Sequence, residues 1–501
     1  MLLLIANGIS TLLGLARGFY IARILSPSDY GAWTLLSVLL NYTNYTDMGV
    51  NTGFILKVPG LIGQGRLDEA QRVQRQAYTA TLIVCGAIAL VVVLISFLSL
   101  GFSVSTIAIL HIVAVAILVT AVLNYYQVVA RIQNKFLAFS LSGLLAAGVA
   151  LGGVIVVGVL PLTFKVELVG YVSVLAAAAA ALLLSMTTRS APLWPPNWRD
   201  ISRLVAIGLP VGLLPIVFTL FQSVDRWVVA VMVPVANLGY YGQGATLGLL
   251  LFMIPNTLAV VLFTRQIEQF GATGDPRSSE SLVLPPLQFS GYIMALMAGG
   301  TVMVVPFIIY YLLPNYLPAT RVAIFQVIGN CLLFAVPIST QFLASVKQIW
   351  RVFSVLLMGA LIEALLVALL VLTPLGIDGA ALAVLISDAI YSIAIAFLVV
   401  RLFSGTLLGQ FSRVALYFLP FSICLPVAWF ILIMNHVRGE LWSDLLRLAE
   451  YGALYLLVCG PLCLLTAWLS GLLHQPFAAT RIRRWLPIPL VDVLLGKGEI
   501  R

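Results

Sequence analysis

The chain has 501 residues, of which 61% are hydrophobic and only 9% are charged, and its net charge is +9. A soluble domain carries about 25% charged residues, so this composition excludes an ordinary soluble protein. We attribute the surplus of Lys and Arg to loops on one side of a membrane rather than to nucleic-acid binding.

Apolar stretches of about 20 residues recur along the whole chain, and each is long enough to cross a bilayer core of about 30 Å. Hydrocarbon offers no water to the backbone, so we expect each stretch to be a helix. The sequence therefore predicts an all-α polytopic membrane protein with 14 spans, at residues 2–24, 31–56, 77–99, 105–129, 136–160, 166–188, 205–233, 239–264, 283–313, 319–345, 352–374, 379–400, 412–434 and 448–473.

The positions of Lys and Arg predict the orientation of these spans. If the N-terminus lies in the cytoplasm, 20 of these residues fall in cytoplasmic loops and the tail, and 5 fall on the opposite side. Positive residues favour the cytoplasmic side of a membrane protein. The bias therefore predicts a multi-pass protein of the cytoplasmic membrane with both termini in the cytoplasm.

A weak internal duplication predicts two lobes. Residues 22–40 and 230–250 share a pattern of an apolar helix end, a turn with Pro, a Gly near aromatic residues and a second apolar helix. Gly31 and Gly239 lie 208 residues apart, and the same offset places Arg17 on Asp225. A repeat of six spans is even, so both lobes start on the same side and the repeat is parallel, as in some transporters.

The predicted organisation follows from this repeat. It comprises an N-terminal lobe at 1–188, a cytoplasmic linker at 189–204, a C-terminal lobe at 205–401, an extra helix pair at 402–473 and a basic cytoplasmic tail at 474–501. The tail is expected to lie on the anionic surface of the membrane.

Charged residues inside apolar spans are costly and are candidates for function. The second span is the most polar, and its residues Asn44, Asp47 and Asn51 are spaced so that a continuous helix would place them on one face. Such a stripe is expected to face a water-filled cavity or a partner helix. Away from the span ends, the charged residues are Arg17, Asp47, Asp225, Arg226, Glu363 and Asp388.

Two interpretations of these charges remain open. They could form buried pairs that lock helices together, for example Arg17 with Asp47, because intramembrane ion pairs can be purely architectural. For the set as a whole we favour a polar cleft between the lobes. A protonated carboxyl group that is hydrogen-bonded can also be accommodated in a membrane helix without a functional role, so Glu363 and Asp388 are weaker candidates for ion coupling.

Signatures of soluble catalysis are missing from the sequence. It contains no G-x-x-x-x-G-K-[ST], H-E-x-x-H or G-x-S-x-G pattern. The three histidines are scattered, and the five cysteines all fall within predicted spans without a zinc or disulfide spacing. We therefore predict no enzyme activity, no cofactor and no metal site.

Two segments resemble a known family. ARILSPSDYGAWTLLSVLLNYTNYTDMGV, from Ala22, resembles the first helical hairpin of the bacterial oligosaccharide and O-antigen flippases, in the multidrug/oligosaccharidyl-lipid/polysaccharide exporter superfamily. Residues 208–248, with the Asp-Arg pair at Asp225 and Arg226, resemble the opening of that family's second lobe.

The resemblance implies a flippase that moves a polyprenyl-pyrophosphate-linked oligosaccharide across the bacterial cytoplasmic (inner) membrane for surface polysaccharide synthesis. The two lobes would alternate between inward-open and outward-open states. A polysaccharide polymerase and a chain-length regulator are the partners implied by the resemblance, besides the lipid-linked cargo and the bilayer.

The residues can be given roles in such a flippase. A guanidinium suits pyrophosphate because its planar fork bonds two oxygens at once. Arg17 and then Arg226 are the predicted pyrophosphate contacts, and the amides of Asn44, Asn51 and Gln222 are predicted to bond sugar hydroxyls. Asp47 and Asp225 are further substrate contacts, and proton or sodium coupling is assigned to the carboxyl groups of Asp47, Asp225, Glu363 and Asp388.

Other functions share part of this pattern. A multidrug/cation antiporter of the same superfamily would have the same outline but a more negative cleft. A lipid II flippase would carry several arginines in its cleft. A membrane polysaccharide polymerase or ligase would present a long outward loop, whereas the longest predicted one, 435–447, is short. A non-transporting scaffold would not need charges at equivalent positions of a repeat.

Overall fold

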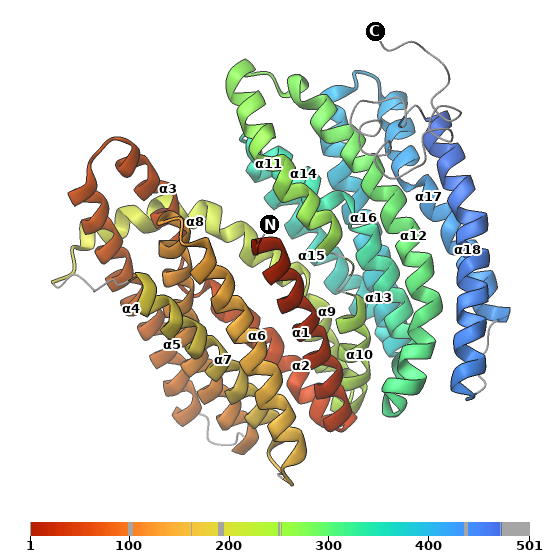
Figure 1. Cartoon of the computed structure of the whole chain (residues 1–501), viewed down its shortest axis with the longest axis horizontal. Coiled ribbons are helices and arrows are strands. Elements are labelled where there is room, and N and C mark those ends of the chain that lie inside the picture. The colour runs from red at the N-terminus through yellow and green to blue at the C-terminus, as the bar shows by residue number, and fades with distance from the viewer. Residues whose placement is uncertain are drawn as a thin grey trace. The chain divides into compact units, whose positions relative to one another are not determined.

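The computed structural model describes residues 2–98, 104–161, 163–188, 195–248, 251, 253–434, 439–470 and 472. Every regular element in these ranges is a helix, which agrees with the predicted fold class (Figure 1). The chain divides into two compact units, Met1–Gly239 and Tyr240–Arg501, here called the N-terminal and C-terminal units.

The N-terminal unit is a helical bundle in which α6 packs against α1 and α7, and α5 packs against α4 and α7. In the same unit, α3 and α8 pack against each other and lie side by side (Figure 1). Its helices are α1 Leu2–Ile24, α2 Pro27–Tyr42, η1 Thr43–Tyr45, α3 Val50–Gly63, α4 Leu67–Leu98, α5 Val104–Ile132, α6 Phe136–Val159, α7 Lys165–Thr188, α8 Trp198–Phe221 and α9 Val224–Met232, followed by the start of α10 Val235–Gly248.

The C-terminal unit is built around α12, which packs against α13, α17 and α18, and around α16, which packs against α13 and α15. The residues predicted to form the extra helix pair, 402–473, include α17 and α18, which contact each other and α12. The helices after α10 are α11 Met253–Thr273, η2 Pro276–Ser279, α12 Glu280–Leu312, η3 Pro314–Ala319, α13 Thr320–Leu332, α14 Ala335–Ser345, α15 Ile349–Val371, α16 Ile377–Phe403, α17 Leu407–Met434 and α18 Leu441–Leu469.

Each predicted span contains helix, but the count of 14 continuous spans is not confirmed. Eleven of the helical stretches in the described ranges are long and apolar enough to cross a membrane, which makes the chain a multi-pass membrane protein. The predicted spans 31–56, 205–233 and 319–345 are each split into two shorter helices, whereas residues 249, 250 and 252 of the span 239–264 lie outside the described residues. Hydropathy averages over a long window and does not detect such breaks.

The break within span 31–56 has a local cause. Ser26 caps α2 by accepting a hydrogen bond from the Asp29 N–H at 3.2 Å, and Pro27 occupies the first turn, where no helical N–H bond is lost. The helix then tightens into η1 and ends in a turn where Met48 and Gly49 have φ of 48° and 81°. These left-handed residues redirect the chain before α3 begins.

This break corrects one prediction. Asn44, Asp47 and Asn51 do not share a face of one continuous helix, because Asn44 lies in η1, Asp47 in the turn and Asn51 in the first turn of α3. The predicted division into two lobes at 189–204 stays a prediction. It rests on the sequence repeat, whereas the two units of the structure are defined by compactness. Part of that linker, 189–194, and the basic tail, 474–501, lie outside the described residues.

Candidate functional site

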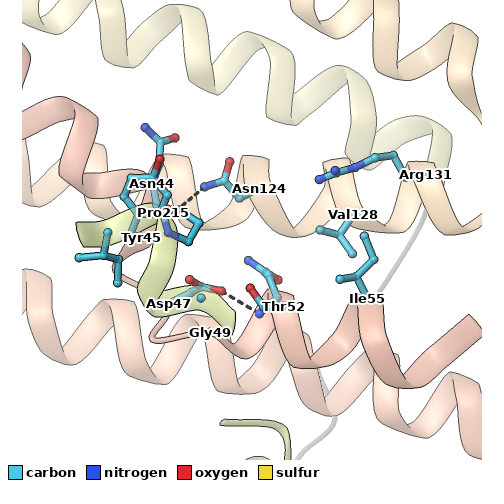
Figure 2. Close-up of a pocket in the computed structure, with 13 residues that line it drawn as sticks. Asn44, Tyr45, Asp47, Gly49, Thr52, Ile55, Asn124, Val128, Arg131 and Pro215 are labelled. Carbon is cyan, nitrogen blue, oxygen red and sulfur yellow. Dashed lines mark hydrogen bonds between the residues drawn. The ribbon is translucent and has the colours of Figure 1, made fainter. Parts of the chain in front are cut away.

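A polar pocket of about 450 Å³ opens within the N-terminal unit (Figure 2). Its volume is in the range of small-molecule sites, which are about 300–1,000 Å³. Its walls come from η1 and α3, from α5 and from α8. The lining residues are Asn44, Tyr45, Asp47, Gly49, Asn51, Thr52, Ile55, Asn124, Val128, Arg131, Gly212, Pro215 and Ile216.

The turn between η1 and α3 forms the polar end of the pocket. The Asp47 carboxylate accepts a hydrogen bond from the Asn51 backbone N–H at 2.7 Å. The first N–H groups of a helix have no partner inside the helix, so Asp47 satisfies one of them and lies where the helix dipole favours a negative charge. Asp47 therefore has a structural role at the start of α3 as well as a place in the pocket wall.

Helix α5 holds this turn in position from the opposite side. The Asn124 side chain donates to the backbone carbonyl of Asn44 at 3.2 Å. The Thr120 hydroxyl donates within α5, to the Ala116 carbonyl at 2.6 Å, and its oxygen lies 3.3 Å from the Thr43 carbonyl. The neighbouring Tyr125 is fully buried and stacks on Phe54 of α3, with ring centroids 5.8 Å apart. These contacts fix the spacing of two pocket walls.

The third wall, α8, approaches α3 through glycines. A Cβ added at Gly49 would lie 2.7 Å from the carbonyl carbon of Gly208, and one added at Gly212 would lie 3.3 Å from the Gly49 Cα. A Cβ at Gly53 would lie 2.9 Å from the backbone carbonyl carbon of Leu204. Helices can come this close only where side chains are missing, so these glycines permit the α3–α8 crossing that closes this wall.

Arg131 is the charged pocket residue that the sequence analysis missed, and the polar residues Thr52 and Asn124 were missed as well. Arg131 lies in the last turn of α5, is exposed, donates from Nε to the Gln127 carbonyl at 3.3 Å, and lies 5.7 Å from the Phe139 ring centroid. Its place at the end of an apolar run is typical of an ordinary basic residue at a cytoplasmic loop. The spacing of Asn124, Val128 and Arg131, which puts them on one helix face, is the signal that could have found it.

The three residues of the predicted polar stripe all line the pocket, whereas Arg17, the predicted pyrophosphate contact, does not. These three residues are Asn44, Asp47 and Asn51. Arg17, in α1, donates to the Ser173 hydroxyl at 2.6 Å and lies 5.7 Å from the Trp33 ring centroid. The alternative in which Arg17 pairs with Asp47 is not seen, because the Arg17 side chain contacts Ser173 of α7 and Trp33 of α2 instead.

Three other predicted residues lie at the junction of α8 and α9. Asp225 is 2% exposed, and Gln222 and Arg226 are half-buried. The Tyr42 hydroxyl and the Ser223 hydroxyl, 2.9 Å apart, join α2 to this junction. None of the three predicted residues is among those lining the pocket.

The two remaining predicted carboxyls belong to the C-terminal unit. Glu363 in α15 and Asp388 in α16 are 2% and 3% exposed. The two helices are joined by a 3.5 Å hydrogen bond from the Ser387 hydroxyl to the Gly359 carbonyl, and Asp388 packs against Gly329 of α13. Their proposed coupling role concerns a region distinct from the pocket. Within the described ranges, no three His, Cys, Asp or Glu residues gather as a metal site.

Comparisons with known proteins place the fold and the family. A multidrug resistance MATE family transporter of the MOP superfamily, in an inward-facing conformation, aligns with a TM-score of 0.62 at 14% identity, over 81% of this chain and 95% of its own. The lipid II flippase MurJ, in an inward closed conformation, aligns with a TM-score of 0.66 at 14% identity, over 92% and 98%. At this identity the likeness shows the fold alone.

The family itself is shown by sequence. The comparison with curated proteins finds no match. The family model described as polysaccharide biosynthesis protein matches residues 20–321, which is more than half of the chain and includes every residue that lines the pocket. The chain is therefore a multi-pass membrane protein with the fold of MOP-superfamily transporters, and it belongs to the polysaccharide biosynthesis protein family.

Proposed function

We propose that this protein is a flippase that moves a polyprenyl-pyrophosphate-linked oligosaccharide across the bacterial cytoplasmic membrane for surface polysaccharide synthesis. The observation that carries the proposal is the polar pocket in the N-terminal unit of a membrane protein from a polysaccharide biosynthesis family. The fold shared with a lipid II flippase supports the same class of cargo.

The pocket offers the chemistry that a sugar head group needs. A polar group moved into hydrocarbon without a partner costs several kcal/mol, and an ionised group costs far more. The amides of Asn44, Asn51 and Asn124 and the hydroxyl of Thr52 supply donors and acceptors for sugar hydroxyls. A head group held there is shielded from lipid, while the polyprenyl tail stays in the bilayer.

Transport rather than chemistry is the proposed activity. The compared structures are named as transporters and a flippase, and the sequence carries no soluble catalytic signature. Alternating access of the two lobes would expose the site first to the cytoplasm and then to the outside. An inside-negative membrane potential favours export of an anionic cargo by about 2.3 kcal/mol per charge per 100 mV.

Deletion of the gene in the native host tests the proposal. Lipid-linked oligosaccharides would be extracted, and the cell surface would be stained for polysaccharide. We expect a polyprenyl-linked repeat unit to accumulate on the cytoplasmic side and surface polymer to be lost, with both restored by the wild-type gene. Normal surface polymer together with new sensitivity to cationic drugs would refute the proposal and assign the protein to the multidrug/cation antiporters.

A further inference from the structure

The two charges of the pocket are not equivalent. Asp47 accepts the Asn51 N–H at 2.7 Å and lies at the N-terminus of α3, where the helix dipole compensates its negative charge. One oxygen of its carboxylate, Oδ2, is therefore already bonded within the fold. The pocket has no other acidic side chain among the residues that line it.

Arg131 has no such compensation by an acid. Its contacts are the Gln127 carbonyl and the Phe139 ring, neither of which carries a negative charge. The ion pairs found in the described part of the chain join Arg66 to Glu69, Arg321 to Asp378 and Arg413 to Glu280. The guanidinium of Arg131 is thus the charge that the pocket leaves available to a ligand.

The position of this charge gives the pocket a direction. Arg131 follows Asn124 by seven residues on α5, so it lies about 10 Å further along the helix at 1.5 Å per residue. Figure 2 shows Arg131 beside Val128 and Ile55, away from the end formed by Asn44 and Asp47. The end of the pocket at Arg131 is therefore cationic. The other end offers neutral amides and the Asp47 carboxylate, which accepts the Asn51 N–H.

We propose that Arg131 binds the phosphate-bearing part of the cargo while the amide end of the pocket binds its sugar. This inference rests on the proposed function and specifies which end of the same pocket binds each part of the cargo. The planar guanidinium can bond two phosphate oxygens at once, which an ammonium group cannot do in the same geometry.

Binding to the full-length protein in lipid nanodiscs tests the proposal. The probes are farnesyl pyrophosphate, inorganic pyrophosphate and farnesol, which separate a lipid pyrophosphate, a free pyrophosphate and the uncharged lipid. We expect Arg131→Gln to raise the Kd for farnesyl pyrophosphate by about 10- to 100-fold, the range for loss of a hydrogen bond to a charged group. Farnesol should bind all variants equally.

Two further variants keep the result interpretable. Arg401 is also an exposed Arg in the last turn of a long helix, α16, but it does not line the pocket. Arg401→Gln removes the same helix-end charge and should leave the Kd unchanged. Arg131→Lys keeps the charge without the fork and should give an intermediate Kd. If Arg131→Gln fails to fold, the comparison of Arg131→Lys with wild type still decides the proposal.

The outcomes separate this inference from the proposed function. Equal affinity of wild type, Arg131→Gln and Arg131→Lys for farnesyl pyrophosphate would overturn the role of Arg131, even if gene deletion causes lipid-linked oligosaccharide to accumulate. Weaker binding by the Arg131 variants would support the anion site, even if deletion leaves surface polysaccharide normal. Tight binding of inorganic pyrophosphate, lost in Arg131→Gln, would support the anion site but show that the lipid tail adds little.

Discussion

The α3–α8 crossing can be tested with a single methyl group at Gly208. A Cβ built there would lie 2.9 Å from the carbonyl carbon of Gly49 and closer still to its oxygen, whereas ordinary contact begins at 3.4 Å. Gly208→Ala therefore requires α3 and α8 to move apart by at least 0.5 Å. The neighbour is backbone rather than a flexible side chain, so rotation of a side chain cannot relieve the clash.

The cost of this substitution follows from overpacking. Extra methylene groups forced into a packed interface typically cost about 1–3 kcal/mol. For a unit of this size, 1 kcal/mol corresponds to a change in Tm of roughly 2–4 °C. We expect Gly208→Ala to lower the Tm of the detergent-purified protein by several degrees, measured by tryptophan fluorescence or light scattering on heating.

Gly60 provides the matched control in the same pair of helices. It lies in α3, and a Cβ there would have no neighbour within 4 Å. Gly60→Ala should keep or slightly raise the Tm, because Ala favours a helix over Gly by about 0.5–1 kcal/mol. Equal Tm values for Gly208→Ala and Gly60→Ala would refute the close crossing, and with it our account of the α8 wall of the pocket.

Two further substitutions separate structural roles from binding roles. Ser173→Ala removes the 2.6 Å partner of Arg17 and should cost about 1.5–3 kcal/mol, seen as a lower Tm. An unchanged Tm would instead favour the cargo-binding role that the sequence predicted for Arg17. Asp47→Ala should cost about 0.5–2 kcal/mol through loss of the bond to the Asn51 N–H, whereas Asp47→Asn keeps an oxygen acceptor and should retain the Tm. Equal loss in both Asp47 variants would show that the charge, not the cap, is what α3 needs.

Hydropathy predicts the positions of the helices well because burial in lipid demands long apolar runs. The first predicted span, 2–24, coincides with α1 Leu2–Ile24. The break within 31–56 escaped prediction because it arises from backbone angles: Met48, a residue with a side chain, adopts a φ of 48° beside Gly49. A window average over 31–56 does not register one turn of left-handed backbone.

The candidate site was predictable only in part, for physical reasons. Asn44, Asp47 and Asn51 were found because polar residues in an apolar stretch are conspicuous. Arg131 was overlooked because basic residues at helix ends are common in membrane proteins and usually need no special explanation. Arg17 was favoured because it lies within a span, but its neighbours in space, Ser173 and Trp33, are distant in sequence.

The most direct test of the central claim asks whether filling the pocket stops transport. Asn44 lines the pocket, whereas Asn41, three residues earlier, is also exposed but does not line it. Each would be replaced with Trp, and the purified proteins would be reconstituted in proteoliposomes with a fluorescent lipid-linked oligosaccharide. Transfer between leaflets would be followed by access of a membrane-impermeant quencher. We expect transfer by wild type and Asn41→Trp but not by Asn44→Trp, with all three folded. Equal transfer by Asn44→Trp and Asn41→Trp would contradict the assignment of this pocket to the cargo.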